Sequence, residues 1–150
     1  MIDQKSMKIL KILQEKARIP NAEVSRQVGL APSAVLERIR KMENQGIIDG
    51  YEVRLNPERF NKKQVAFVGV NPMPDAHIPD LGEKLASLSE VLEVHYVANG
   101  DNFLLKVRTA DTAALGEFLQ QKISPLKDVQ STTTTTVLST IKETSRITIE

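Results

Sequence analysis

A glycine between two short amphipathic segments is the feature that most constrains how this chain can fold. Val24 and Val28 stand four residues apart in a segment that ends at once in Gly29, where the left-handed conformation of a tight turn costs least. Leu30 follows and is expected to point into the core. Pro32 suits the first turn of a longer helix, because its missing N–H would have no helical partner there. This order of helix, glycine turn and helix predicts a helix-turn-helix unit.

Helical spacing of apolar residues predicts the rest of this unit. Asp3 can cap a first helix that extends to Ala17, and Pro20 stops it. Asn21 is then expected to cap the second helix. The third helix is expected to end at Gly46 and to bury a stripe of four apolar side chains, which are Val35, Leu36, Ile39 and Met42.

The opposite side of the third helix carries small residues near its start and long cations further along. Small side chains permit close approach to a DNA groove, and cations can reach phosphates. Arg38 can reach a guanine edge, although bracing the helix against its neighbour is a competing role. The candidate DNA-binding residues are Arg26, Pro32, Ser33, Ala34, Glu37, Arg38, Arg40 and Lys41. A solvated face on an ordinary three-helix bundle is the alternative interpretation.

The charge of the chain is nearly balanced, with 20 Lys and Arg against 19 Asp and Glu in 150 residues. Residues 1–60 hold 11 of these cations and 8 of the anions, so the front half is mildly basic and the rear half mildly acidic. This small excess excludes phosphate binding by bulk charge, so any affinity for nucleic acid must come from a local surface.

The rear half alternates between strand-like and helix-like segments. Residues 47–55 are apolar and β-rich, which predicts a strand that leaves the helical unit. The turn-forming residues 99–102 predict a hairpin between the strands that flank them. Further strands are expected at 65–70, 91–97, 103–107 and 129–138, with helices marked by Leu81, Leu85 and Leu88 and by residues 111–123.

This order, βαββαβ, predicts an α+β fold in which a winged helix-turn-helix domain precedes a ferredoxin-like antiparallel sheet. Its helices would lie on one face, so the other face of the sheet needs a cover. Dimerisation through that bare face is the economical solution.

Composition excludes several classes of protein. The chain has no Cys, which excludes a disulfide scaffold and a thiolate zinc site. No apolar run is long enough to span a membrane, and a charged, periodic start leads us to expect no signal peptide and a cytoplasmic location. His77 and His95 form no metal pair, and no catalytic motif is present. We therefore expect no enzyme activity, no cofactor, no metal and no membrane partner.

Short motifs along nearly the whole chain carry a family resemblance. No single motif is specific, but their order and spacing together resemble the leucine-responsive regulatory protein/AsnC (Lrp/AsnC) family of transcription regulators. The motifs include Ala17-Arg18-Ile19, Val28-Gly29-Leu30, Arg38-Ile39, Gly46-Ile47-Ile48, Leu55-Asn56-Pro57, Gly100-Asp101 and Val137-Leu138.

The resemblance implies a DNA-binding domain joined to a ligand-sensing domain. It divides the chain into residues 1–52, a hinge at 53–63, a sensing domain at 64–138 and a tail at 139–150. Family members pair through the sheet, assemble further into octamers and bind pseudo-palindromic promoter DNA, with amino acids as common effectors. The implied effector-binding residues are Ala98, Asn99, Gly100, Asp101, Asn102, Thr133 and Thr135. A solvent-exposed hairpin turn and ordinary β-branched strand residues are the alternative interpretation.

Two departures from the family pattern keep other functions open. Ala31 stands where the family prefers a serine cap, and Ser6 stands where it usually has a second aspartate. Loss of the cap weakens the start of the third helix by about 1 kcal/mol. One alternative function is therefore an amino-acid-sensing or assembly module without DNA binding. Another is an enzyme similar to the sirohaem decarboxylases, which share this architecture but need histidines around a tetrapyrrole.

Overall fold

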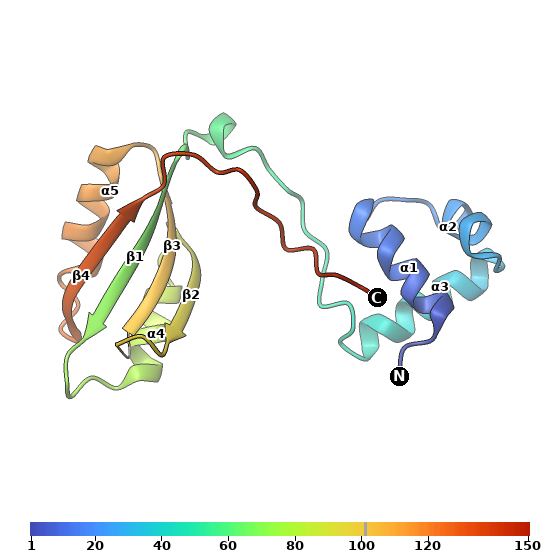
Figure 1. Cartoon of the computed structure of the whole chain (residues 1–150), viewed down its shortest axis with the longest axis horizontal. Coiled ribbons are helices and arrows are strands. Elements are labelled where there is room, and N and C mark those ends of the chain that lie inside the picture. The colour runs from blue at the N-terminus through green and yellow to red at the C-terminus, as the bar shows by residue number, and fades with distance from the viewer. Residues whose placement is uncertain (101) are drawn as a thin grey trace. The chain divides into compact units, whose positions relative to one another are not determined.

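The computed structural model describes residues 1–100 and 102–150. The chain divides into two compact units (Figure 1). The first unit comprises residues 1–54 together with 143–150, and the second comprises residues 55–142. None of the helices in the described part of the chain has the length and apolar character of a membrane span.

Three helices form the first unit, as the apolar spacing predicts: α1 (Gln4–Glu15), α2 (Asn21–Val28) and α3 (Pro32–Asn44). Asp3 caps α1, since its carboxylate accepts the backbone N–H of Ser6 at 3.0 Å. Each helix contributes apolar side chains to one shared core, whose buried members are Ile9, Val24, Val28, Val35, Ile39 and Met42.

The turn between α2 and α3 has the predicted geometry. Gly29 is in the left-handed conformation with φ of 66°, and its N–H donates to Ser25 O at 2.9 Å. The N–H of Leu30 donates to the same oxygen at 3.2 Å, and its side chain packs against the core. The Lys5 ammonium donates to the backbone carbonyl of Val28, the last residue of α2. The predicted helix-turn-helix arrangement is therefore confirmed.

Three local predictions in this unit were wrong. The first helix ends at Glu15, so Ala17 lies outside it and is exposed. Asn21 is the first residue of α2 and not its cap; that position is held by Pro20, which offers no side-chain acceptor. Leu36 is 37% exposed. The buried side of α3 consists of Val35, Ile39 and Met42, and Leu36 lies beside this stripe and not within it.

The strand expected over residues 47–55 is absent from the structure. Gly46 turns the chain back with φ of 67°, and the N–H groups of Ile47 and Ile48 donate to Met42 O at 2.9 and 3.2 Å. Ile48 then packs against the helical core. The apolar residues that resembled a strand therefore end α3 and seal the helical unit.

The last residues of the chain belong to the helical unit. Gln14 Nε2 donates to Ile147 O at 3.0 Å, and Ile147 N donates back to Gln14 Oε1 at 2.9 Å. Arg146 forms an ion pair with Glu15 at 2.9 Å. Residues 143–150 are thus held along α1 by paired hydrogen bonds and a charge contact.

The second unit has the predicted βαββαβ order. After a short 3₁₀ turn, η1 (Pro57–Phe60), come β1 (Gln64–Pro72), α4 (Ile78–Ala86), β2 (Val91–Val97) and β3 (Asn102–Thr109). Helix α5 (Thr112–Phe118) continues into a π-helical turn, η2 (Leu119–Ile123), before β4 (Val129–Thr136). The strands form one antiparallel sheet in the order β2-β3-β1-β4.

Both helices of this unit pack on one face of the sheet. Side chains of α4, α5 and η2 share a core with alternate residues of β1 and β3, including Leu81, Phe118, Val68 and Leu105. The residues between them point to the other face, where Phe67 and Leu104 are 36% and 37% exposed. The structure therefore has the one bare sheet face that the element order predicts.

Candidate nucleic-acid interface and effector site

The side of α3 that points away from the core presents a continuous polar stripe. Ser33, Glu37 and Lys41 follow one another at spacings of four residues, and Arg40 stands three residues after Glu37, which places all four on one side of a helix. All four are exposed, as is Pro32. The structure thus brings five of the eight predicted DNA-binding residues together on one surface, and half-buried Ala34 adjoins them.

Arg38 is turned toward α1 and not toward solvent. Its Nη1 donates to Asp3 Oδ2 at 2.6 Å and to Ser6 Oγ at 3.0 Å, and its side chain is 34% exposed. These contacts tie the middle of α3 to the start of α1. The structure therefore shows the bracing role that competes with base contact.

The electrostatics of Asp3 follow from these contacts. The N–H of Ser6, followed by the Arg38 guanidinium, stabilises the carboxylate and lowers the pKa of Asp3 from 3.8 to about 2. Asp3 is therefore charged throughout the physiological range. Ser6 is buried and also donates its hydroxyl to Asp3 at 3.3 Å, so Ser6 joins Asp3 in holding Arg38.

The first turn of α3 has no side-chain cap. Ala31 occupies the cap position and has no side-chain acceptor, although its carbonyl accepts Val35 N–H at 3.1 Å. The backbone N–H groups at this end therefore face solvent beside exposed Ser33. A helix start of this kind can receive a DNA phosphate.

Arg26, the remaining candidate, lies on α2. Its guanidinium pairs with Glu23 one turn earlier on the same helix, and its side chain is 74% exposed. An exposed pair of this kind contributes little stability. Arg26 can therefore exchange Glu23 for a phosphate at small cost.

The predicted effector residues on the hairpin lie at one end of the sheet. Ala98, Asn99 and Gly100 are exposed in the turn between β2 and β3, and Gly100 has φ of 79°. Asp101 lies outside the described residues. Asn102 Nδ2 donates to Asn71 Oδ1 at 3.2 Å, which connects this turn to the end of β1.

The hydrogen-bonded row continues across the sheet. Asn71 Nδ2 donates to Ser131 Oγ on β4 at 2.9 Å. Sequence reasoning missed Asn71 and Ser131, because only the strand register places them beside Asn102. The row Asn102–Asn71–Ser131 supplies amide and hydroxyl groups next to the turn.

Thr133 and Thr135 lie farther along β4, opposite Gly69 and Phe67 of β1. Both are exposed on the bare sheet face. Strand β1 separates them from β3 and its turn, so a single chain does not bring them together with the hairpin residues.

Each of the two histidines lies beside a carboxylate of its own segment. His77 pairs with Asp80 at 3.1 Å and His95 with Glu93 at 3.1 Å, and all four side chains are largely exposed. The His95 contact is the main reason that the pKa of Glu93 is lowered. Within the described residues, no three His, Asp or Glu side chains cluster in a way that could hold a metal ion.

A helix-turn-helix unit in one chain with a ferredoxin-like unit is consistent with a DNA-binding transcription regulator that has a sensor domain. Comparisons with known families agree with this class. Residues 2–49 match the winged helix-turn-helix DNA-binding family, and residues 65–147 match the Lrp/AsnC ligand binding domain.

Similar proteins give the same result over the full chain. Leucine-responsive regulatory proteins of Klebsiella pneumoniae and Escherichia coli are each 35% identical over 153 aligned positions, covering 99% of this chain and 92% of theirs. The L-Met complex of a Neisseria meningitidis transcriptional regulator superposes with a TM-score of 0.93 at 30% identity, covering 99% of this chain and 97% of that one. Escherichia coli AsnC superposes with a TM-score of 0.90 at 30% identity, covering 97% and 98%. The chain belongs to the Lrp/AsnC family of transcription regulators.

Proposed function

We propose that this protein reads double-stranded promoter DNA with the exposed stripe of α3 and adjusts that binding in response to a small amino acid. The observation that carries the proposal is the stripe itself, which lies opposite the buried side of α3 in a helix-turn-helix unit. Such a unit places its second helix in the major groove. The family membership supports both halves of the proposal.

The exposed residues divide by chemistry into two roles. Ser33, Ala34 and Glu37 lie toward the start of α3 and face the base edges, where small or hydrogen-bonding groups can approach closely. Arg40 and Lys41, with Arg26 on α2, hold phosphates. Arg38 positions α3 through its contacts with Asp3 and Ser6 and makes no base contact.

Affinity measurements on DNA upstream of the protein's own gene test this assignment. Replacing Lys41 by Ala should weaken binding to all sequences alike and reduce the slope of log affinity against log salt by about one unit. Lys127→Ala, an exposed change in the second unit, should leave affinity and slope unchanged. Equal slopes for Lys41→Ala and the unaltered protein would remove Lys41 from the DNA contact.

The bare sheet face supports a homodimer. Phe67 and Leu104 are partly exposed there, and a second copy of the same face would cover both. Thr135 and Thr134 are neighbours on β4 that point to opposite faces, because they pair with exposed Phe67 and buried Val68 respectively. They offer a matched pair of variants.

Sedimentation of both variants at micromolar concentration tests which face of the sheet forms the dimer. Thr135→Asp should shift the dimer toward monomer, since a twofold axis brings like charges together on the bare face. Thr134→Asp should remain dimeric. Monomers alone in the unaltered protein would contradict the dimer, and octamers would show that dimers assemble further.

The hairpin end of the sheet is the proposed effector site between paired sensing units. Two solved structures with this fold are methionine complexes. One is the Neisseria meningitidis regulator, and the other is a feast or famine regulatory protein of Mycobacterium tuberculosis. The second superposes with a TM-score of 0.90 at 29% identity over the full length of both chains. In this chain the turn residues, Asn102 and its row to Ser131 can bind an amino acid, and a partner copy would bring Thr133 and Thr135 closer to the turn.

Ligand binding alters DNA affinity only if the ligand prefers one assembly or interdomain arrangement. Residues 55–61 are the proposed hinge for that change. Thermal-shift measurements with the twenty amino acids test the effector, and no shift at millimolar concentration would indicate a regulator without one. We further propose a cytoplasmic protein without catalytic activity.

A further inference from the structure

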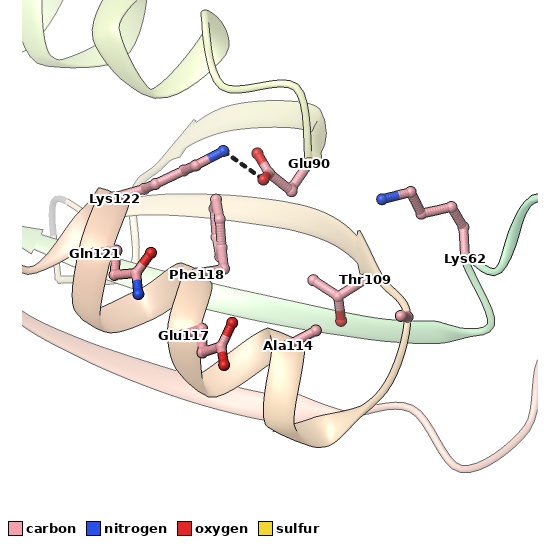
Figure 2. A pocket seen from close by; sticks show the side chains of 9 residues that line it. Lys62, Glu90, Thr109, Ala114, Glu117, Phe118, Gln121 and Lys122 are labelled. Atoms are coloured by element: carbon pink, nitrogen blue, oxygen red, sulfur yellow. Dashed lines mark hydrogen bonds and ion pairs between the residues drawn. The ribbon is translucent and has the colours of Figure 1, made fainter.

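A hollow of about 190 Å³ lies beside α5, at the end of β3 opposite the hairpin turn. Figure 2 shows its lining side chains, which come from α5 and η2, from the residues at the start of β2 and the end of β3, and from the linker just before β1. The length of β3 separates this hollow from the turn by about 23 Å, at about 3.3 Å per residue. None of the predicted effector residues that the structure describes lines it.

Charges of both signs surround the hollow. Lys122 and Glu90 already form an ion pair across one side (Figure 2). Burial opposes ionisation of Glu90, but the Lys122 ammonium together with the Glu90 backbone N–H and the Ser89 hydroxyl outweighs it, so the pKa of Glu90 is lowered. This pair is therefore charged at neutral pH and closes that side of the hollow.

The two remaining charged side chains, Lys62 and Glu117, are exposed and form no hydrogen bond or ion pair within the described residues. The Lys62 side chain extends toward the space beside Thr109 in Figure 2. Between these charges the lining is apolar, with the Phe118 ring and Ala114. The hollow thus offers one free cation, one free anion and a small apolar surface.

We propose that this hollow binds an α-amino acid as its zwitterion, with Lys62 holding the carboxylate and Glu117 the ammonium group. The proposal rests on the amino-acid response proposed above and adds a second site to it. A zwitterion matches a lining whose four charges sum to zero. The volume equals that of about six water molecules at about 30 Å³ each, which accommodates the amino-acid backbone while a longer side chain extends along Phe118 toward solvent.

The position of Lys62 connects such a site to the hinge. Lys62 N donates to Pro57 O at 2.9 Å, and Lys62 O accepts from Arg108 Nη1 at 3.3 Å. Lys62 therefore joins η1, at the end of the linker, to β3. A ligand held between Lys62 and α5 would fasten η1 to the sheet, which gives the ligand a preference for one linker conformation.

Alanine methyl NMR of the full chain can observe the two sites separately. Ala110 and Ala114 line the hollow, whereas Ala98 lies in the hairpin turn. Each of the twenty amino acids is titrated in turn, beginning with L-methionine. We expect at least one amino acid to shift the Ala110 and Ala114 methyl signals, and the shift to reach a plateau as the ligand concentration rises.

Charge variants then test the assigned contacts. Lys62→Gln and Glu117→Gln should each weaken the ligand's effect on Ala110 and Ala114 about tenfold or more, as expected for loss of a charge-assisted hydrogen bond. Lys63→Gln, at the adjacent exposed lysine outside the lining, should change nothing. The N-acetyl form of the ligand, which lacks the ammonium charge, should bind equally to Glu117→Gln and to the unaltered protein.

The outcomes distinguish this site from the proposed effector function. Shifts at Ala98 alone, or shifts at Ala110 and Ala114 that are indifferent to Lys62 and Glu117, would overturn the hollow as a zwitterion site and leave the hairpin effector site intact. No shift at any of the three methyls with any amino acid would overturn both. Shifts at Ala110 and Ala114 that depend on both charges would support the second site.

Discussion

At the scale of single residues, one ion pair links the middle of α3 to the start of α1. Asp3 accepts from Ser6 N–H and from the Arg38 guanidinium, so one carboxylate caps α1 and holds α3. Ser6 supports both partners with its hydroxyl. The same contacts that lower the pKa of Asp3 to about 2 therefore also position the stripe of α3.

The Asp3 contacts predict a specific acid sensitivity. Because its pKa is lower in the folded protein than the ordinary value of 3.8, Asp3 stabilises the fold above about pH 4, and this contribution is lost as the pH falls toward 2. In denaturant unfolding, the free energy of unfolding of Asp3→Asn should fall less steeply with decreasing pH across that window than the free energy of unfolding of the unaltered protein. Asp75→Asn, which removes an exposed charge elsewhere, should leave the slope unchanged. Parallel curves for Asp3→Asn and the unaltered protein would refute the role of Asp3.

The uncapped start of α3 predicts a stabilising substitution. Ala31→Ser supplies an acceptor for the free N–H groups and should raise the free energy of unfolding by about 1 kcal/mol. Ala17→Ser, at an exposed residue outside any helix, is the matched control and should have no effect. Thermal unfolding followed by circular dichroism measures both, and unchanged stability of Ala31→Ser would show that the first turn already has its partners.

At the scale of elements, local chemistry could be predicted from the sequence and long-range contacts could not. Gly29 marks the turn because few other residues adopt the left-handed conformation at low cost, and Pro32 marks the first turn of α3 because its missing N–H has no helical partner there. The strand expected at residues 47–55 failed because tertiary packing decides how a short apolar run is used, and Ile48 packs on the helical core. The α3 surface followed from helical spacing, whereas the row from Asn102 to Ser131 required the strand register.

The contact of the tail with α1 is the extreme case, since Gln14 and Ile147 are 133 residues apart. Gln14→Ala removes both of its hydrogen bonds to Ile147 and should lower the stability of the helical unit by about 1 kcal/mol. Hydrogen exchange at the Ile147 amide reports the contact directly and should accelerate in this variant. Gln4→Ala, at the exposed start of α1, should leave the exchange rate unaltered. An unaltered rate in Gln14→Ala would mean that the tail is held without Gln14.

At the scale of the whole molecule, DNA specificity requires two copies of the α3 stripe. The first 60 residues carry only three more cations than anions, so one copy offers too little positive charge to bind DNA strongly through phosphate contacts alone. A dimer formed through the bare sheet face doubles the contacts and fixes the distance between half-sites. We propose that the hinge and the amino-acid sites act by changing how well that distance matches the DNA.

Hydroxyl-radical footprinting on DNA upstream of the gene tests whether two α3 helices bind the duplex together. We expect two protected patches related by twofold symmetry, with centres about 34 Å apart or a multiple of it, and loss of both patches together in Ser33→Asp. A single patch, or two patches that persist in Ser33→Asp, would contradict the claim that paired α3 helices read the duplex.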